Sequence, residues 1–294
     1  MKYCCVLIVC LILCLTCGRE ETRIVRTCTD RHPSWAHSDS LIAFYRDPEN
    51  QYIENLNMAY PPPQVNNDIA GIHLLNRETG DVFFLTVGFT PDWSFNSTQI
   101  VFTYHEFGDI RTIDIATGVT SQLTDMNATR PQWSPQGDCI VCEKTVDTIG
   151  IYLIYPGGMI RQILGSAVEP SWHPADGTLL FLAQHETQYG ICVGDTNGTI
   201  IRFIREVSGQ AYPKFSPDGT RILYYDIQDQ YVHIMDTLGN NDFALIEGYD
   251  PAWSADGQTV VFAAPVDSGD ETCYSLWSIR TDGSELQRLT YPDD

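Results

Sequence analysis

One phrase recurs along this chain and limits its fold more than any other feature. A proline, a variable residue and an aromatic residue, followed in most copies by serine, precede a turn and a run rich in β-branched residues. The six copies are "HPSWAHSDSLIAF" from His32, "TPDWSFNSTQIVF" from Thr90, "RPQWSPQGDCIVC" from Arg130, "EPSWHPADGTLLF" from Glu169, "YPKFSPDGTRILY" from Tyr212 and "DPAWSADGQTVVF" from Asp250. Their prolines are 58, 40, 39, 43 and 38 residues apart, so the chain is an array of similar units.

Each unit contains the elements of four short strands. The proline phrase forms the first strand, and a Ser-Pro-Asp-Gly turn leads into a second strand such as "RILYYDI". A third strand such as "YVHIMD" follows, then a Gly-containing turn such as "DTLG", and strands such as "IRFI" and "LQRLT" close the units. No stretch has a sustained helical period. The sequence therefore predicts an all-β, six-bladed β-propeller of four-stranded antiparallel blades over residues 32–294.

An aromatic residue occupies the same position in every copy of the phrase. Because each blade can bury its faces only against its neighbours, we expect these side chains to fill the wedges between blades. A contact with a cofactor or carbohydrate is the alternative. The six residues are Trp35, Trp93, Trp133, Trp172, Phe215 and Trp253.

The phrase Pro-x-Trp-Ser-Pro-Asp-Gly, the β-branched strand after it and the closing "xxLT" resemble the WD-like repeat of Tol-B-like β-propellers over residues 32–290. The resemblance implies the propeller fold, but such propellers serve as binding modules, scaffolds and enzyme domains. Some Tol-B-like propellers with an extra blade are lyases that use a metal held by histidines and a glutamine. This chain is too short for a seventh blade. A minor alternative is an extracytoplasmic fragment homologous to the propeller half of a peptidase that has lost its catalytic half.

The N-terminal segment is typical of an export signal. One lysine precedes an uncharged run from Tyr3 to Thr16, which suits a signal peptide over residues 1–16. The following "CLTCG" is similar to a lipobox, so we expect Cys17 to be lipidated and residues 17–31 to form a tether. Plain secretion and an uncleaved anchor are the alternatives. The expected location is the cell envelope, as a periplasmic or outer-membrane-anchored lipoprotein.

The charge of the chain selects among partners. With a formal net charge of −21 and 17 Lys+Arg, the sequence argues against binding to a nucleic-acid backbone. Loops that share one face of the predicted ring carry many carboxylates, among them Asp125, Glu169 and Asp250. We therefore expect a non-enzymatic scaffold, without a cofactor, that binds a protein or peptide partner of basic character. The alternative is that these carboxylates form an ordinary solvent-exposed rim with no binding role.

Two His-Glu pairs give the opposing hypothesis. His105–Glu106 and His185–Glu186 fall at matching places in the second and fourth units and could hold a metal at the channel mouth. A carbohydrate-active lyase or hydrolase would follow from such a site. The units are not neighbours, however, and inherited similarity between repeats is the preferred explanation of the pairs. No residue is assigned a catalytic role, because no nucleophile elbow, phosphate loop or HExxH pattern is present.

Cysteines and the first long interval complete the expectations. Cys28 and Cys273 lie in loops that adjoin in a closed ring, so we expect them to form a disulfide. Cys139 and Cys142 are expected to be small buried hydrophobic residues. The segment 46–68 forms an enlarged loop, either functional or a tolerated insertion. "TRIVRT" at 22–27 reads as a tether or as a fourth strand for the last blade.

Overall fold

The structure of the chain is a computed structural model that describes residues 24–38, 40–53, 70–104, 108–267 and 272–291. The side chains of residues 24–28, 48–53, 267 and 272 are not part of that description. Within these ranges the regular elements are β-strands, numbered β1 to β24. No helix among the described residues is long and apolar enough to cross a bilayer. The all-β prediction is therefore confirmed.

Four separate sheets each contain four consecutive antiparallel strands. The first comprises β5 (Phe89–Trp93), β6 (Gln99–Tyr104), β7 (Asp109–Asp114) and β8 (Thr120–Thr124). The second comprises β9 (Thr129–Trp133), β10 (Ile140–Lys144), β11 (Gly150–Ile154) and β12 (Ile160–Gly165). The third comprises β13 (Val168–Trp172), β14 (Leu179–His185), β15 (Gln188–Gly194) and β16 (Ile200–Glu206). The fourth comprises β17 (Lys214–Phe215), β18 (Arg221–Asp226), β19 (Tyr231–Asp236) and β20 (Phe243–Glu247).

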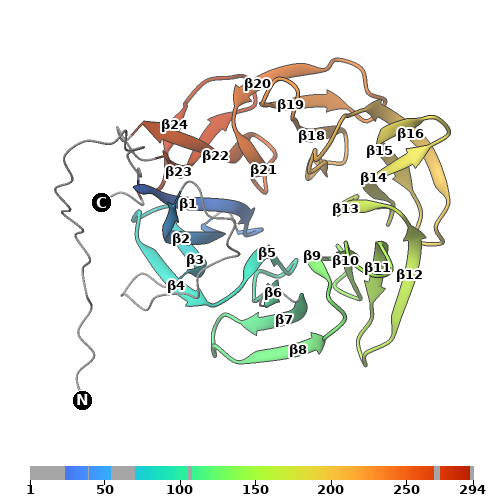
Figure 1. Cartoon of the computed structure of the whole chain (residues 1–294), viewed down its shortest axis with the longest axis horizontal. Coiled ribbons are helices and arrows are strands. Elements are labelled where there is room, and N and C mark those ends of the chain that lie inside the picture. Colours follow the sequence, from blue (N-terminus) through green and yellow to red (C-terminus); the bar gives the residue numbers. More distant parts are fainter. Residues whose placement is uncertain (1–23, 39, 54–69, 105–107, 268–271, 292–294) are drawn as a thin grey trace, which may run out of the picture.

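The remaining eight strands form one continuous sheet. Its first half comprises β1 (Ile24–Trp35), β2 (Leu41–Ile53), β3 (Gly71–Asn76) and β4 (Val82–Thr86). Its second half comprises β21 (Tyr249–Trp253), β22 (Thr259–Asp267), β23 (Thr272–Arg280) and β24 (Gln287–Arg288). The halves join where Thr29 of β1 pairs in parallel with Tyr274 of β23. The sheets stand around a common centre, with the first strand of each set innermost and the fourth outermost (Figure 1).

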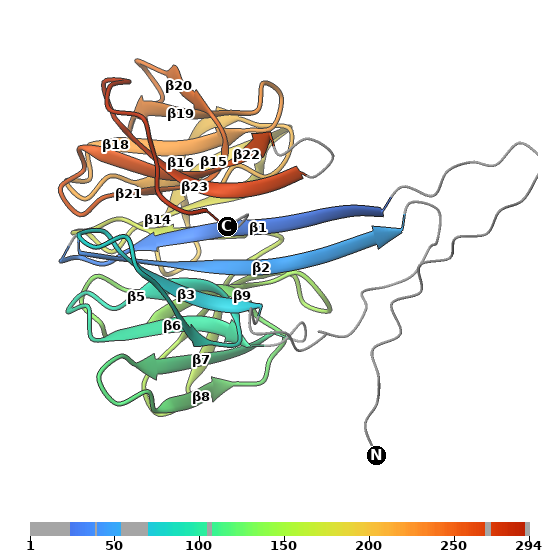
Figure 2. The same cartoon turned by 90° about the vertical axis from the view of Figure 1, so that its left-hand side faces the viewer.

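The sequence predicted six separate four-stranded blades, and the described strands differ from that count. Four blades are separate sheets, whereas the first and last sets of strands share one sheet. The reason is the length of β1, which starts at Ile24 instead of near His32 and runs past the other strands together with β2 (Figure 2). Its N-terminal half thereby reaches the edge of β23.

The ring is closed from both ends of the chain. Residues 24–31, which we assigned to a tether, belong to β1. The C-terminal strand β24 pairs with β23 through Trp277–Arg288 and Ser278–Gln287, as expected for the segment "LQRLT". β1 and β24 therefore share the edge of β23 that β22 leaves open. "TRIVRT" does not occupy the place of the fourth strand.

The core lies between successive sets of strands. Each described hydrophobic cluster draws residues from two neighbouring sets: Leu180, Ile191, Ile222 and Tyr224, for example, join the third and fourth separate sheets. The recurring aromatic residues pack in these clusters, as predicted. Three of them also donate an indole N–H to a backbone carbonyl of the preceding set: Trp93 to Ser34 (3.1 Å), Trp172 to Gln132 (3.4 Å) and Trp253 to Lys214 (3.3 Å).

Candidate functional site

The residue before each recurring proline has an unusual backbone conformation. None of these six residues, here called the pre-proline residues, is glycine, yet all have a left-handed φ, which is uncommon for such residues. They are His32 (51°), Thr90 (47°), Arg130 (50°), Glu169 (55°), Tyr212 (47°) and Asp250 (49°). In five sets the strand register also shifts at this point, as in a β-bulge, between residues such as Phe89 and Asp92. A bulge re-aims side chains, and here it directs the pre-proline residues toward the centre of the ring.

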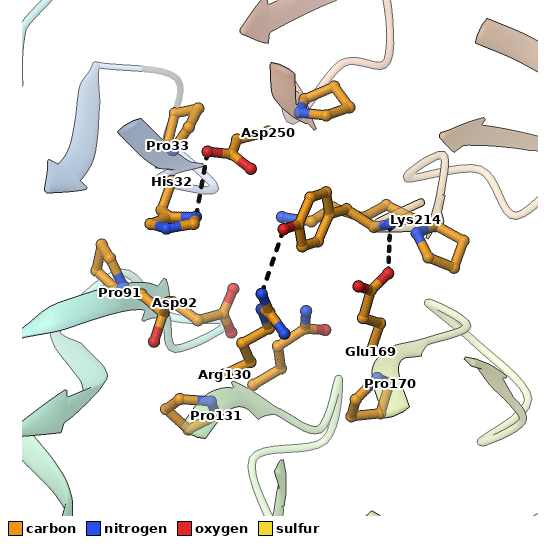
Figure 3. Close-up of a pocket in the computed structure, with 15 residues that line it drawn as sticks. His32, Pro33, Pro91, Asp92, Arg130, Pro131, Glu169, Pro170, Lys214 and Asp250 are labelled. Atoms are coloured by element: carbon orange, nitrogen blue, oxygen red, sulfur yellow. Dashed lines mark hydrogen bonds and ion pairs between the residues drawn. The ribbon is translucent and has the colours of Figure 1, made fainter. Parts of the chain in front are cut away.

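Two cavities meet at the centre. The narrow cavity, about 70 Å³, is lined by the pre-proline residues and the prolines that follow them (Figure 3). The wide cavity, about 400 Å³, is lined by the ends of the first strands and the turns that follow. Asp92, Gln132 and Lys214 line both cavities, and we call these three residues the constriction.

A closed polar network lies beside the narrow cavity. Glu143 of β10, fully buried, accepts hydrogen bonds from Arg130 Nη1 (2.5 Å) and from the backbone N–H of Glu169 (2.5 Å). Glu169 in turn accepts from the backbone N–H groups of Ala211 (3.0 Å) and Tyr212 (2.7 Å). The network therefore joins three successive sets of strands through buried charged groups.

Electrostatics in this network follow from burial and pairing. Although burial acts in the opposite direction, the Glu143 carboxylate raises the pKa of Arg130. Burial raises the pKa of Glu169 against the opposing charge of Arg130. Arg130 also donates to the Tyr212 hydroxyl at 3.3 Å and lies over its ring. Arg130 is thus held by the Glu143 carboxylate and by Tyr212, both within the propeller.

Asp250 is the second buried acid of the narrow cavity. It is 5% exposed, and its Oδ2 lies 3.1 Å from Arg31 Nε and 3.4 Å from His32 Nδ1. Burial alone would raise the pKa of Asp250, but His32 and Arg31 hold it below its ordinary value. Asp250 therefore serves as the counter-ion of Arg31, while burial lowers the pKa of its other neighbour, His32.

The constriction has a different character. Asp92 accepts from the backbone N–H of Trp133 (3.0 Å) and from Ser34 Oγ (3.3 Å). Burial nevertheless raises the pKa of Asp92 to about 6, against the charge of Lys214. Burial also lowers the pKa of Lys214. Asp92 and Lys214 come from strands on facing sides of the pocket (Figure 3).

The residues singled out in the sequence are distributed over the molecule. Glu169 and Asp250 line the narrow cavity. Asp125 and Glu186 are exposed, and His185 stacks on Phe203 with ring centroids 6.1 Å apart, away from both cavities. His105 and Glu106 lie outside the described residues. Among the described residues, no group of three or more His, Cys, Asp or Glu side chains is placed to hold a metal.

The cysteines divide into bonded and free residues. Cys273 is buried and disulfide-bonded. Cys28 lies in β1, but its side chain is outside the described part, and Cys17 lies outside it altogether. Cys139 and Cys142 are free and buried, as predicted, and Cys192 is likewise free and buried. Burial raises the pKa of Cys142 to about 12, so it behaves as an inert core residue. The prediction of a long loop over residues 46–68 was wrong for residues 46–53, which belong to β2, where Arg46 forms two bonds of 2.7 Å to buried Asp30. Residues 54–69 are outside the description.

Sequence reasoning missed the constriction and the wide cavity. The signal was present in the repeat, because the positions on either side of the proline vary while the proline and the aromatic residue stay constant. The variable positions carry the charged residues that line the channel. The expected binding face was the other one, where the loops precede the prolines. The larger cavity instead opens at the turn end of the first strands.

Comparison with known proteins agrees with this architecture. The family model of the TolB beta propeller domain matches residues 84–294, and no curated protein matches the chain. The solved structure of TolB from Acinetobacter baumannii is similar with a TM-score of 0.58 and 17% identity, over 71% of this chain and 52% of that chain. This chain therefore spans about half the length of that relative.

Two other solved structures share the fold. A TolB-type protein from Agrobacterium tumefaciens has a TM-score of 0.62 and 16% identity, over 74% of this chain and 86% of that chain. An oligogalacturonate lyase in complex with manganese has a TM-score of 0.56 and 15% identity, over 91% of this chain and 79% of that chain. At these identities the likenesses show the fold alone. The family match covers most of the chain, and the chain belongs to the TolB beta propeller domain family.

Proposed function

We propose that this protein is a non-enzymatic binding propeller of the cell envelope. The observation that carries the proposal is the channel: every repeat contributes the residues around its proline to two joined cavities on a rigid β scaffold. Family membership supports a binding role, because TolB-type propellers present such a scaffold. The partner proposed is a protein or peptide of basic character, attracted by the net charge of −21.

The ring proposed is six-bladed, with the eight-stranded sheet counted as two blades that β1 fuses. Two observations support this count. β1–β4 and β21–β24 each repeat the order of the separate sheets. The hydrophobic cluster of Trp35, Phe44, Val261 and Leu276 packs the two halves together as neighbouring blades do elsewhere.

A disulfide between Cys28 and Cys273 is proposed as the covalent part of the closure. The parallel pairing of Thr29 with Tyr274 supports this proposal, because Cys28 and Cys273 directly precede these two residues in their strands. Cys273 is bonded, and the other described cysteines are free. Peptide mapping of the unreduced full chain checks this: a crosslinked peptide should contain both residues. A crosslink from Cys273 to any other cysteine would contradict it.

The proposed location rests on the N-terminal sequence. Cleavage after residue 16 and lipidation of Cys17 would hold the propeller at a membrane through a short segment before β1. Mass spectrometry of the protein from membranes should find a lipid-modified N-terminal Cys17. An unmodified N-terminus in the soluble fraction would instead indicate plain secretion.

Affinity capture tests the binding role. The full chain, immobilised and exposed to envelope extract, should retain one basic protein that is released by high salt. A variant with Glu186→Gln and Asp125→Asn tests where the partner binds, because it removes two exposed charges from the face where the loops precede the prolines. Weaker capture by this variant would place the partner on that face. Failure of wild type to retain any protein would contradict the proposal.

A second candidate is a metal-dependent lyase or hydrolase that acts on carbohydrate. The observation in its favour is the fold shared with the manganese-bound oligogalacturonate lyase. His105 and His185 are the residues that such an enzyme would use. Calorimetric titration with Mn²⁺, on the wild type and on a His105→Ala, His185→Ala variant, decides between the functions. Stoichiometric binding lost in the variant favours the enzyme, and no binding favours the scaffold.

A further inference from the structure

The constriction holds two side chains that lack partners in the described structure. The backbone carbonyls of Lys214 and Gln132 accept the indole N–H groups of Trp253 and Trp172. Within the part of the chain that the structure describes, no group forms a hydrogen bond or ion pair with the Lys214 ammonium or the Gln132 carboxamide. Both side chains line both cavities. They are therefore hydrogen-bond donors directed at the channel.

The carboxylates nearby do not neutralise Lys214. Asp250 attracts it, but the Oδ2 atom of Asp250 already lies beside Arg31 and His32. Asp92 also attracts it, yet accepts its hydrogen bonds from Ser34 and Trp133. A cation in a partly dehydrated site without a direct partner is costly, and burial lowers the pKa of this amine accordingly. An anion supplied by a ligand would remove that cost.

The wide cavity indicates what such an anion would be attached to. Its wall contains aromatic rings and prolines, among them Trp93, Phe215, Pro174 and Pro217. Three serine hydroxyls in the wall are used by the turns, since Ser134 donates to Asp138, Ser216 to Asp218 and Ser254 to Asp256. The wide cavity, about 400 Å³, offers these rings among polar groups and is large enough for the body of a ligand, whereas the narrow cavity, about 70 Å³, admits only one small group.

We propose that the constriction binds the carboxylate of a ligand with an apolar or aromatic body. Lys214 and Gln132 donate to the two carboxylate oxygens, and the body occupies the wide cavity. A free small carboxylate and the C-terminal carboxylate of a peptide offer the same chemistry. This site is independent of the envelope partner proposed above, and each can fail without the other.

The site has an expected pH dependence. Asp92 faces Lys214 across the constriction, and the groups that contact it from β1 and β9, the Ser34 hydroxyl and the Trp133 N–H, do not titrate. The other charged groups, His32, Arg130, Glu169 and Asp250, line the narrow cavity beyond. Ionised Asp92 repels an incoming carboxylate, whereas protonated Asp92 does not. Affinity should therefore rise as the pH falls through about 6, where the pKa of Asp92 lies.

The chain offers a sharp probe because it contains only three lysines, Lys2, Lys144 and Lys214. Reductive ¹³C-methylation of the full chain gives lysine signals that lysine-to-arginine variants assign, and methylation keeps their charge. Three probes share a phenyl ring and differ in charge: phenylacetate, phenylacetamide and phenethylamine. Phenylacetate should shift the Lys214 signal and leave that of Lys144 in place. By calorimetry on the unmodified chain, phenylacetamide should bind at least tenfold more weakly, and phenethylamine more weakly still.

Variants and peptides complete the test. Lys214→Met should weaken the binding of phenylacetate at least tenfold, and Gln132→Leu should weaken it several-fold. The matched control Lys144→Met should leave the affinity unchanged. Thermal melts should confirm that all three variants are folded. The affinities of the peptide Gly-Gly-Phe and of its C-terminal amide distinguish the two possible sources of the carboxylate. If the peptide with the free carboxylate binds more tightly than its amide, the site is assigned to peptide C-termini. If phenylacetate binds and neither peptide does, the site is assigned to small carboxylates. Equal binding of the three probes, tighter binding of phenethylamine, or unchanged affinity in folded Lys214→Met would overturn the proposal.

Discussion

The two parts of the channel use charge in opposite ways. Beside the narrow cavity, Glu143, Arg130 and Glu169 bond to one another and to the backbone of the next set of strands. At the constriction, Lys214 has no such bond among the described groups. The network is built on the pre-proline residues Arg130 and Glu169 and on Glu143 of β10, whereas the residues of the constriction directly follow the recurring prolines. The comparison teaches that positions on the two sides of one proline can connect blades in one case and leave a ligand site in the other.

The largest effect is expected where the buried network is broken. Glu143→Leu leaves Arg130 and the Glu169 N–H without their acceptor in a fully buried place. The free energy of unfolding should fall by about 3–5 kcal/mol, as measured by urea denaturation. The matched control is Asp109→Asn, which removes the partner of Arg111 at 3.7 Å in a more exposed pair and should cost about 1 kcal/mol or less. Equal decreases in the free energy of unfolding for the two variants would contradict a special role of the buried network.

A smaller loss is expected for the second acid of the network. Glu169→Gln keeps an oxygen for the N–H groups of Ala211 and Tyr212 but removes the charge beside Arg130. We expect a decrease of about 1–3 kcal/mol in the free energy of unfolding. The measurement is the same denaturation series. A loss as large as that of Glu143→Leu would show that the network does not centre on Glu143.

Asp92 should give the constriction a distinct pH signature. The folded-state pKa of Asp92 is raised from 3.8 to about 6, so the folded state keeps a proton that the unfolded state releases earlier. The resulting stability is present below the unfolded pKa and is lost as the pH rises through about 6. Asp92→Asn should flatten this part of the stability curve and make the protein more stable at pH 7. An unchanged curve between pH 4 and 7 would contradict the assignment.

The smallest effect belongs to the unpaired lysine. Lys214→Met removes a charge that bonds to no described group, while the backbone carbonyl that Trp253 uses remains. Because the dehydrated ammonium has no direct partner, the free energy of unfolding should not fall, and it should rise by about 1 kcal/mol or less. At the same time, the pKa of Asp92 should rise further, because Lys214 lowers it in the wild type. A loss of several kcal/mol would indicate that Lys214 belongs to a structural network after all.

Much of the fold was predictable because the repeat states it directly. Proline, aromatic residue, turn and β-branched run recur with a nearly constant spacing, and the strands follow this order. The extent of β1 was not predictable. "TRIVRT" has the same pattern as an outer strand, and only the free edge of β23 decides that Thr29 pairs there.

The candidate site was predictable only in part. Glu169 and Asp250 were singled out as acidic residues of loops, and they line the narrow cavity. Lys214 and Gln132 were not singled out in the sequence, because strand alternation alone does not show which side chains point toward the channel. The left-handed φ of the pre-proline residues, with a register shift in five of the six sets, changes that alternation, and a left-handed φ before proline is not what local preferences suggest.

The pKa of the Lys214 ammonium tests the central contrast most directly. It can be followed by NMR of the ¹³C-methylated full chain, with the same amine in the urea-unfolded chain as its reference. An unpaired amine in a partly dehydrated constriction should titrate below the unfolded reference, as burial lowers its pKa from 10.5. A folded-state pKa at or above the reference would mean that Lys214 is ion-paired, and the constriction would then be one more connection between blades.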